Sequence, residues 1–207
     1  MTESTSNLTR FFRNPGQLKT LEHYLLPDLL SRLLRTGIRK VNLLSAGCST
    51  GEEPYSVAML LSELLPEGFS FAICAVDRSG PAIASAVKAC YTPNQCEGVP
   101  PLYRGRYLER EGEGYRVSEE IRERVRFELG EIESIELQED FDLVLCRNLL
   151  TYTEEDRRTA LAERLWLLMK PYSYLLIGGS ESLLGVSSRF EYLECEWSSY
   201  YRKFAPE

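Results

Sequence analysis

The stretch LLSAGCSTGEEPYS, from Leu43 to Ser56, carries the clearest structural pattern in the sequence. It begins as an apolar run, crosses a turn of small residues between Gly47 and Gly51, and ends in two carboxylates ahead of Pro54. Proline is favoured in the first turn of a helix, and acidic side chains stabilise the positive end of the helix dipole. The stretch therefore predicts a buried strand, a tight turn and a helix over 54–65.

The same turn limits the kind of ligand that it can hold. A phosphate site at a helix start uses backbone amides and often a lysine, whereas Glu52 and Glu53 repel a diphosphate and attract a cation. Plain helix capping also accounts for acids at this position, so the turn by itself leaves capping and ligand binding open.

Outward from this stretch, strands and helices alternate. Strands are expected over 40–46, 69–77, 124–130, 140–148 and 172–180, with two shorter ones over 189–195 and 198–204, and helices over 15–36, 54–65, 80–91 and 154–169. Nearly continuous apolar strands separated by helices predict an α/β fold, a doubly wound parallel sheet with both faces covered. Residues 91–117 break this rhythm with three prolines, and we expect a small inserted subdomain there with a hairpin near 109–117.

Composition excludes several classes of protein. The 207 residues carry a net charge of −7, which argues against a nucleic-acid partner. Six cysteines without a CxxC pair and a single histidine, His23, argue against a zinc site, so no metal is expected. No apolar run approaches the roughly 20 residues of a membrane span and no signal peptide is evident, which predicts a cytoplasmic protein without membrane insertion.

Polar residues follow the predicted strands where a doubly wound sheet binds its ligand. Asp77 ends the second strand, 26 residues after Gly51, and Arg147 with Asn148 follows the fourth. An acid at about this spacing binds ribose hydroxyls in nucleotide sites. A ligand with ribose and positive charge but no phosphate is S-adenosyl-L-methionine, and Asp77 favours this interpretation over capping alone.

The chain resembles the CheR family of chemotaxis receptor glutamate O-methyltransferases. The motifs that carry the resemblance are NLTRFFR (7–13), SAGCSTGEEPYS (45–56), VD (76–77), FDLVLCRNLLTY (141–152) and GGSESL (178–183). The resemblance implies a class I SAM-dependent methyltransferase fold with a mostly parallel seven-stranded sheet, and one domain over 1–207 that contains the inserted subdomain 91–117.

The resemblance also assigns site residues. It implies that the cofactor is S-adenosyl-L-methionine, with S-adenosyl-L-homocysteine as product, and that Arg13 and Tyr152 flank the reacting methyl group. One or both of Glu52 and Glu53 bind the charged end, and Asp77 takes the ribose. The cofactor-binding set is Asn7, Thr9, Arg13, Gly47, Glu52, Glu53, Asp77, Glu131, Ile132, Arg147 and Asn148.

The implied reaction methylates glutamate side chains on the cytoplasmic helices of a chemotaxis receptor, or another protein carboxylate, by a monomeric enzyme. A carboxylate is already ionised at neutral pH, so no general base is required. Arg13 would hold the incoming carboxylate and Tyr152 would orient it.

Departures from the family pattern leave a second interpretation open, a non-catalytic SAM-binding or protein-docking module. Only eight residues precede Thr9, where the family carries a helical domain that reads the receptor. Glu131 stands where the family has an asparagine near the adenine, PYSY replaces a glycine turn before the fifth strand, and GGSE replaces GHSE. The hairpin of the insertion is also short.

Overall fold

The computed structural model describes residues 9–138 and 140–204. Its centre is a pair of parallel strands, β1 (Lys40–Ala46) and β2 (Ser70–Asp77), aligned with Leu43 opposite Ile73. Both strands are buried along most of their length because helices cover the sheet on both faces, which accounts for their continuous apolar sequence.

The main sheet has seven strands in the order β6-β2-β1-β7-β8-β10-β9. The first five of these run parallel, and β10 is antiparallel to both of its neighbours, β8 and β9. The remaining strands are β6 (Val125–Leu129), β7 (Phe141–Cys146), β8 (Met169–Ile177), β9 (Phe190–Glu194) and β10 (Ser199–Lys203). This order confirms the doubly wound, mostly parallel seven-stranded sheet that the sequence predicts.

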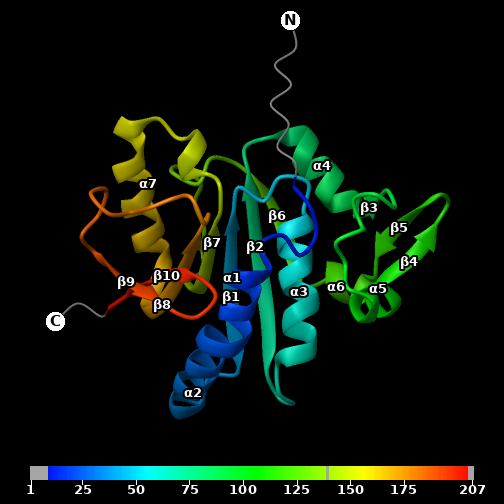
Figure 1. Ribbon diagram of the computed structural model, residues 1–207, viewed down its shortest axis with the longest axis horizontal. Helices are drawn as coiled ribbons and strands as arrows, with labels where there is room; N and C mark the ends of the chain where they lie inside the picture. The colour runs from blue at the N-terminus through cyan, green and yellow to red at the C-terminus, as the bar shows by residue number, and fades with distance from the viewer. Residues whose placement is uncertain (1–8, 139, 205–207) are drawn as a thin grey trace, which may run out of the picture.

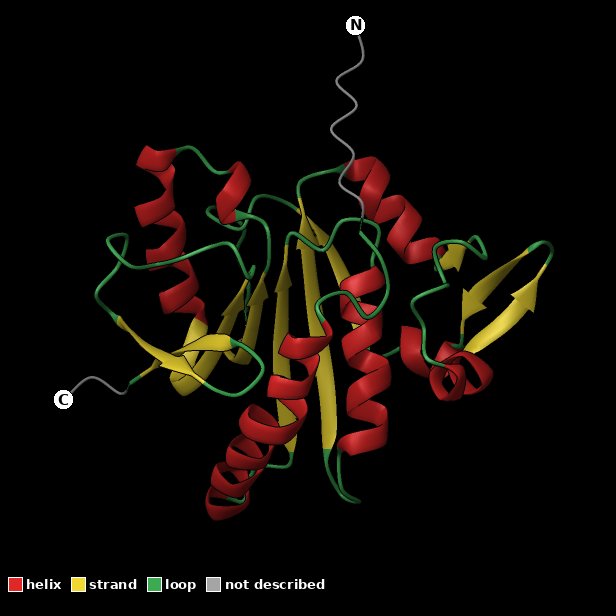
Figure 2. Cartoon of the chain, in the orientation of Figure 1, coloured by secondary structure: helices red, strands yellow, loops and turns green. Residues whose placement is uncertain are grey.

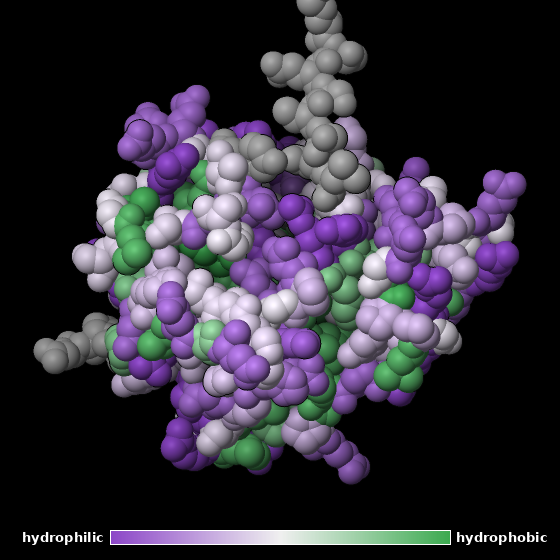
Figure 3. Space-filling view, viewed as in Figure 1, coloured by the Kyte–Doolittle hydropathy of each residue, from purple (hydrophilic) through white to green (hydrophobic). Residues whose placement is uncertain are grey.

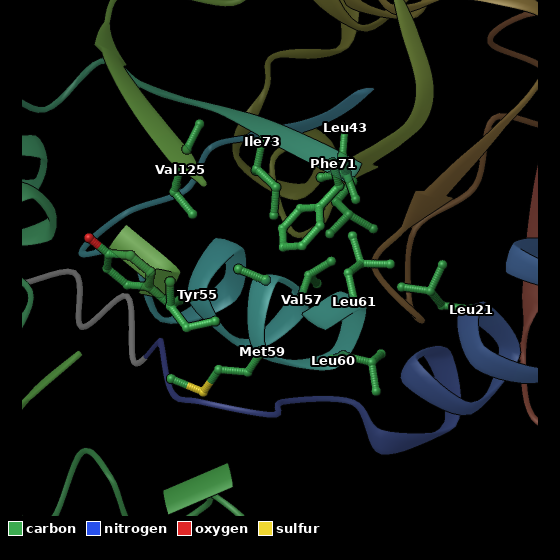
Figure 4. Close-up of a cluster of buried hydrophobic side chains, with 14 of the residues drawn as sticks. Leu21, Leu43, Tyr55, Val57, Met59, Leu60, Leu61, Phe71, Ile73 and Val125 are labelled. Carbon is green, nitrogen blue, oxygen red and sulfur yellow. The ribbon is translucent and has the colours of Figure 1, made fainter. Parts of the chain in front are cut away.

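Helices cover the two faces of the sheet unequally (Figure 1). One face carries α2 (Leu26–Thr36), α3 (Glu52–Leu64) and α4 (Gly80–Lys88), and the other carries α7 (Glu155–Leu168). Figure 4 shows Val57 and Leu61 of α3 pointing toward Phe71 of β2, in the larger of the two apolar clusters. The packing of α3 fixes the turn before it, because that turn has little freedom between a buried strand and a buried helix.

The first helix differs from its prediction. Residues 15–36 form α1 (Pro15–Thr20), a π-helical turn η1 (Leu21–Leu25) and α2, and Pro27 does not interrupt the helix. In the wider turn the N–H of Leu26 reaches the carbonyl of Leu21, one residue beyond the usual partner. Pro27 lies in the first turn of α2, a position at which proline is tolerated.

The segment after α4 forms a second, smaller sheet, at one side of the molecule (Figure 1, Figure 2). It contains β3 (Cys90–Tyr91), α5 (Pro101–Tyr107), β4 (Leu108–Glu111) and β5 (Gly114–Val117), and α6 (Glu119–Arg122) follows. The predicted helix over 80–91 is wrong at its end, because Ala89 has a left-handed backbone that stops α4 and lets Cys90–Tyr91 pair with β5. β4 and β5 form the expected hairpin.

The surface is mixed in polarity. Figure 3 shows mainly hydrophilic residues on the face seen in Figure 1, with small apolar areas between them. Among the residues that the structure describes, no helix is both long enough and apolar enough to cross a membrane.

Candidate cofactor and methyl-transfer site

The carboxyl ends of β1, β2 and β7 bring most of the predicted site residues together. Gly47 follows β1 with a left-handed backbone (φ 80°), and its N–H donates to the carbonyl of Val76 at 2.8 Å. The turn therefore lies directly against the end of β2, where Asp77 stands. Gly51 is also left-handed (φ 94°), and a Cβ there would come within 2.9 Å of the Tyr91 hydroxyl, so glycine is required for both reasons.

Asp77 is bound to this turn through its carboxylate. Oδ2 accepts from the N–H of Ser49 at 2.7 Å, and Oδ1 accepts from the N–H of Ser79 at 2.9 Å. A carboxylate has about four acceptor positions, so each oxygen retains room for one further donor. Two vicinal hydroxyl groups are donors of the kind that such a carboxylate can take.

A buried polar network lies beside it. Glu53 accepts from Ser45 Oγ at 2.7 Å and forms an ion pair with Arg147, whose Nε lies 2.5 Å from Glu53 Oε2. Arg147 Nη1 also donates to the Arg13 carbonyl at 3.0 Å. Arg13, Glu53 and Arg147 line one small hollow, so the N-terminal segment, α3 and the end of β7 meet at this point.

Gln17 completes the network, and the sequence contained no signal for it. Its Nε2 donates to the carbonyl of Ile177 at 2.5 Å, and its Oε1 accepts from Arg147 Nη1 at 3.4 Å. Helix α1 is thereby fixed to the end of β8, which holds the Arg13 backbone in place.

Glu52 points elsewhere. It is fully buried and accepts from Thr50 Oγ1 at 2.6 Å and from Gln95 Nε2 at 3.3 Å. Tyr91 donates to the Thr50 carbonyl at 2.6 Å. The second sheet and its flanking loop therefore support the glycine turn from outside, and Glu52 belongs to that support.

The field at the turn is negative. Burial, followed by the charges of Asp77 and Glu53, raises the pKa of the Cys48 thiol, so this side chain stays neutral. Three carboxylates, those of Glu52, Glu53 and Asp77, surround a single turn, with Arg147 as the paired cation of one of them. A ligand carrying positive charge suits this environment.

The N-terminal segment crosses over α3. Phe11 is buried against Tyr91 with ring centroids 4.8 Å apart, and the N–H of Phe12 donates to Ser56 Oγ at 2.9 Å. A Cβ on Gly98 would lie 2.7 Å from the Phe11 carbonyl oxygen, so the segment is enclosed between α3 and the loop after β3. Arg13 is therefore anchored beside the site by its neighbours.

The remaining predicted residues that the structure describes lie in different environments. Thr9 is half-buried, and Asn7 lies outside the described residues. Glu131 follows β6 and is exposed, with Oε2 3.4 Å from Arg157 Nη2, whereas the Ile132 side chain is buried in the core. Asn148 has a left-handed backbone (φ 64°) directly after Arg147. Tyr152 ends the short helix η2 (Leu150–Tyr152), and its side chain lies outside what the structure describes.

A larger hollow of about 690 Å³ lies on the sheet away from these residues. Lys40, Asn42, Arg124, Arg126 and Phe141 are among its lining, and it contains none of the predicted site residues. The larger of these two hollows is thus not the place where the sequence motifs converge.

Comparison with known proteins identifies the relatives of the chain. Residues 7–199 match the family described as CheR methyltransferase, SAM binding domain. A chemotaxis protein methyltransferase of Borreliella burgdorferi is 32% identical over 195 residues, 91% of this chain and 69% of that protein. Chemotaxis protein methyltransferase 1 of Pseudomonas aeruginosa is 31% identical, covering 96% of this chain and 74% of that protein. A probable biofilm formation methyltransferase, WspC, of the same organism is 34% identical, and the match spans only 42% of its length.

Proposed function

The chain belongs to the CheR methyltransferase family and is a SAM-dependent methyltransferase of class I fold; on that premise, we propose that it methylates glutamate carboxylates of a chemotaxis receptor. The observation that carries the proposal is the convergence of Arg13, Glu53 and Arg147 on one hollow at the start of α3, with the Asp77 carboxylate bound to the turn that precedes this helix. The chain covers 69% of the Borreliella burgdorferi relative and 42% of WspC from Pseudomonas aeruginosa.

The residues present fit S-adenosyl-L-methionine. Asp77 has acceptor positions left for two ribose hydroxyls, and the left-handed turn at Gly47 brings the backbone close to a ligand. Glu53 is favoured over Glu52 for the charged end, because Glu53 lines the hollow whereas Glu52 faces Gln95. When bound, the cofactor supplies the methyl group and leaves as S-adenosyl-L-homocysteine.

The remaining cofactor contacts are proposals of the same kind. Asn148 has a left-handed backbone directly after β7. Its peptide groups are therefore oriented differently from those of a helical or extended residue, and we propose that this orientation serves cofactor binding. Glu131 offers acceptors to the adenine amino group, and Ile132 offers its backbone, because its side chain is committed to the core. Asn7 and Thr9 would close over the cofactor from the N-terminal side.

For the transfer itself, the chain needs to align a carboxylate that is already ionised. Arg13 would hold one oxygen of the incoming glutamate by a charge-assisted hydrogen bond, and Tyr152 would orient the other. Alignment and exclusion of water can supply much of the rate enhancement, so a site without a positioned histidine suffices. His23, exposed on the N-terminal helix against Trp197, takes no part in this scheme.

The proposal also includes the organisation of the chain. We propose that residues 91–117 act as a subdomain within one methyltransferase domain, and that its loop supports the glycine turn through Tyr91 and Gln95. Arg13 and Tyr152 remain the proposed catalytic pair.

Tritium-labelled methyl transfer to receptor cytoplasmic fragments tests the proposal. Glutamate methyl esters release methanol in mild base, whereas methyl groups on nitrogen do not. We expect base-labile counts with the wild-type chain and about a hundredfold lower rate with Arg13→Gln. Base-stable label, or label that is indifferent to Arg13, would point to a different acceptor.

A further inference from the structure

We propose that Glu181 is a positioning residue that fixes the loop after β7, residues 147–152, in the shape that methyl transfer requires. The inference rests on the proposed function, because that loop carries Arg147, Asn148 and Tyr152. Glu181 lies in the loop after β8, within the motif GGSESL, and the family resemblance assigns no role to it.

The carboxylate of Glu181 accepts four hydrogen bonds. Oε2 accepts from the N–H of Gly178 at 2.6 Å and the N–H of Asn148 at 2.8 Å. Oε1 accepts from the N–H and the hydroxyl of Thr151, at 2.8 and 3.0 Å. All four partners donate, so only a group with acceptors on both branches fits, and a glutamine amide would turn N–H toward N–H.

The surroundings show that this arrangement is constrained. Asn148 has a left-handed backbone, a conformation that persists in a non-glycine residue when neighbouring contacts hold it. A Cβ on Gly178 would lie 2.6 Å from Glu181 Oε2 and 3.1 Å from the Asn148 nitrogen. The absence of a side chain at Gly178 therefore leaves space for the Glu181 carboxylate, which accepts from the N–H of the left-handed Asn148.

The two ends of the loop depend on Glu181 to different degrees. Arg147 is held independently by Glu53 and by the carbonyl of Arg13. Thr151, which precedes Tyr152, is held across the loop by Glu181. Asn148 also donates to Glu181, but it follows the independently held Arg147, whereas Thr151 has both of its contacts on Glu181. Loss of the carboxylate should therefore disturb the transfer step, through Thr151 and Tyr152, more than cofactor binding through Asn148.

Kinetics of Glu181→Gln test this split, with Glu196→Gln as a control that removes the same charge at an exposed position. We expect kcat to fall about tenfold to a hundredfold, while the affinity for S-adenosyl-L-homocysteine changes less than about threefold. Thr151→Val should lower kcat in the same sense, and Thr151→Ser should restore it. Equal kcat in wild type and Glu181→Gln would overturn the inference, as would a fall in affinity that matches the fall in kcat.

Hydrogen exchange supplies a readout that does not depend on activity. In Glu181→Gln the amides of Asn148 and Thr151 should exchange faster, while those of β7 keep their protection. Unchanged protection in the loop would overturn the inference whatever the activity. A wild-type chain that methylates no carboxylate would instead contradict the proposed function, and the exchange result would still decide the role of Glu181.

Discussion

At the scale of single residues, Asp77 gives the most specific prediction about cofactor affinity. Asp77→Ala should weaken both S-adenosyl-L-methionine and S-adenosyl-L-homocysteine by about ten- to a hundredfold, since a charged hydrogen-bond partner contributes roughly 1.5–3 kcal/mol. Calorimetry measures this, with Asp156→Ala, an exposed acid in α7, as the matched control. Because Asp77 also accepts from Ser49 and Ser79, urea unfolding of the variant is needed to separate binding from folding. Unchanged affinity would remove Asp77 from the site.

Glu131 gives the opposite expectation. Glu131→Asn should leave the affinity for S-adenosyl-L-homocysteine unchanged or raise it, because asparagine offers both a donor and acceptors at an adenine edge. The ion pair with Arg157 is exposed and contributes at most about 1 kcal/mol, so its loss should not disturb the fold. Calorimetry against Glu136→Asn, an exposed neighbour, is the comparison. A tenfold loss would mean that this chain has built its adenine pocket around the carboxylate.

Single residues also show how far the sequence alone can predict a site. The position of Asp77 beside the glycine turn was predictable, because an acid at the carboxyl end of an apolar strand, one strand after such a turn, is typical of a ribose site. Gln17 was not, since a lone glutamine in a helix carries no signal until the fold brings Ile177 and Arg147 to it. Glu52 and Glu53 are adjacent and chemically alike, so the sequence does not show which of them pairs with Arg147. The structure shows that Glu53 forms the ion pair with Arg147 and that Glu52 accepts from Gln95, because the two side chains leave α3 in different directions.

At the scale of elements, the irregularities were the unpredictable part. Continuous apolar strands predict a parallel sheet, and five of the seven strands of the main sheet form a parallel run, as expected. The π turn at Leu21–Leu25 and the left-handed backbone of Ala89 depend on the packing around them. The amino-acid types at these positions give no signal for either feature. The helices α5 and α6 are short, so they lack the several turns from which a helical period can be read.

The bulge in β8 gives a prediction at this scale. Tyr172 is left-handed (φ 59°) at the place where the family has a glycine turn, and the register between β7 and β8 shifts nearby. Tyr172→Gly should raise the free energy of unfolding by about 0.5–1 kcal/mol, because the left-handed strain exceeds the added entropy of the unfolded chain. Urea titration would measure it, with Tyr172→Phe unchanged because it keeps the Cβ. A stability loss in Tyr172→Gly would show that the ring itself holds the bulge.

At the scale of the whole molecule, charge should govern the encounter with substrate. The chain carries −7, and a glutamate-rich receptor helix is also negative, so repulsion slows association at low ionic strength. Raising salt from about 10 mM to about 150 mM shortens the screening length from about 30 Å to about 8 Å, and initial rates on receptor fragments should rise. A neutral peptide with one glutamate is the control. A rate that falls with salt would indicate a local basic surface that attracts the substrate.

The proposed methylation of receptor glutamates is tested most directly by locating the transferred methyl group on the substrate. A receptor cytoplasmic fragment, incubated with the wild-type chain and S-adenosyl-L-methionine, would be digested and analysed by mass spectrometry before and after mild base. We expect methyl esters on glutamate side chains that disappear in base, and we expect Asp77→Ala and Arg13→Gln to form them more slowly than the wild-type chain. Methyl groups on nitrogen, or an unmodified fragment beside a chain that binds S-adenosyl-L-methionine, would contradict the proposal.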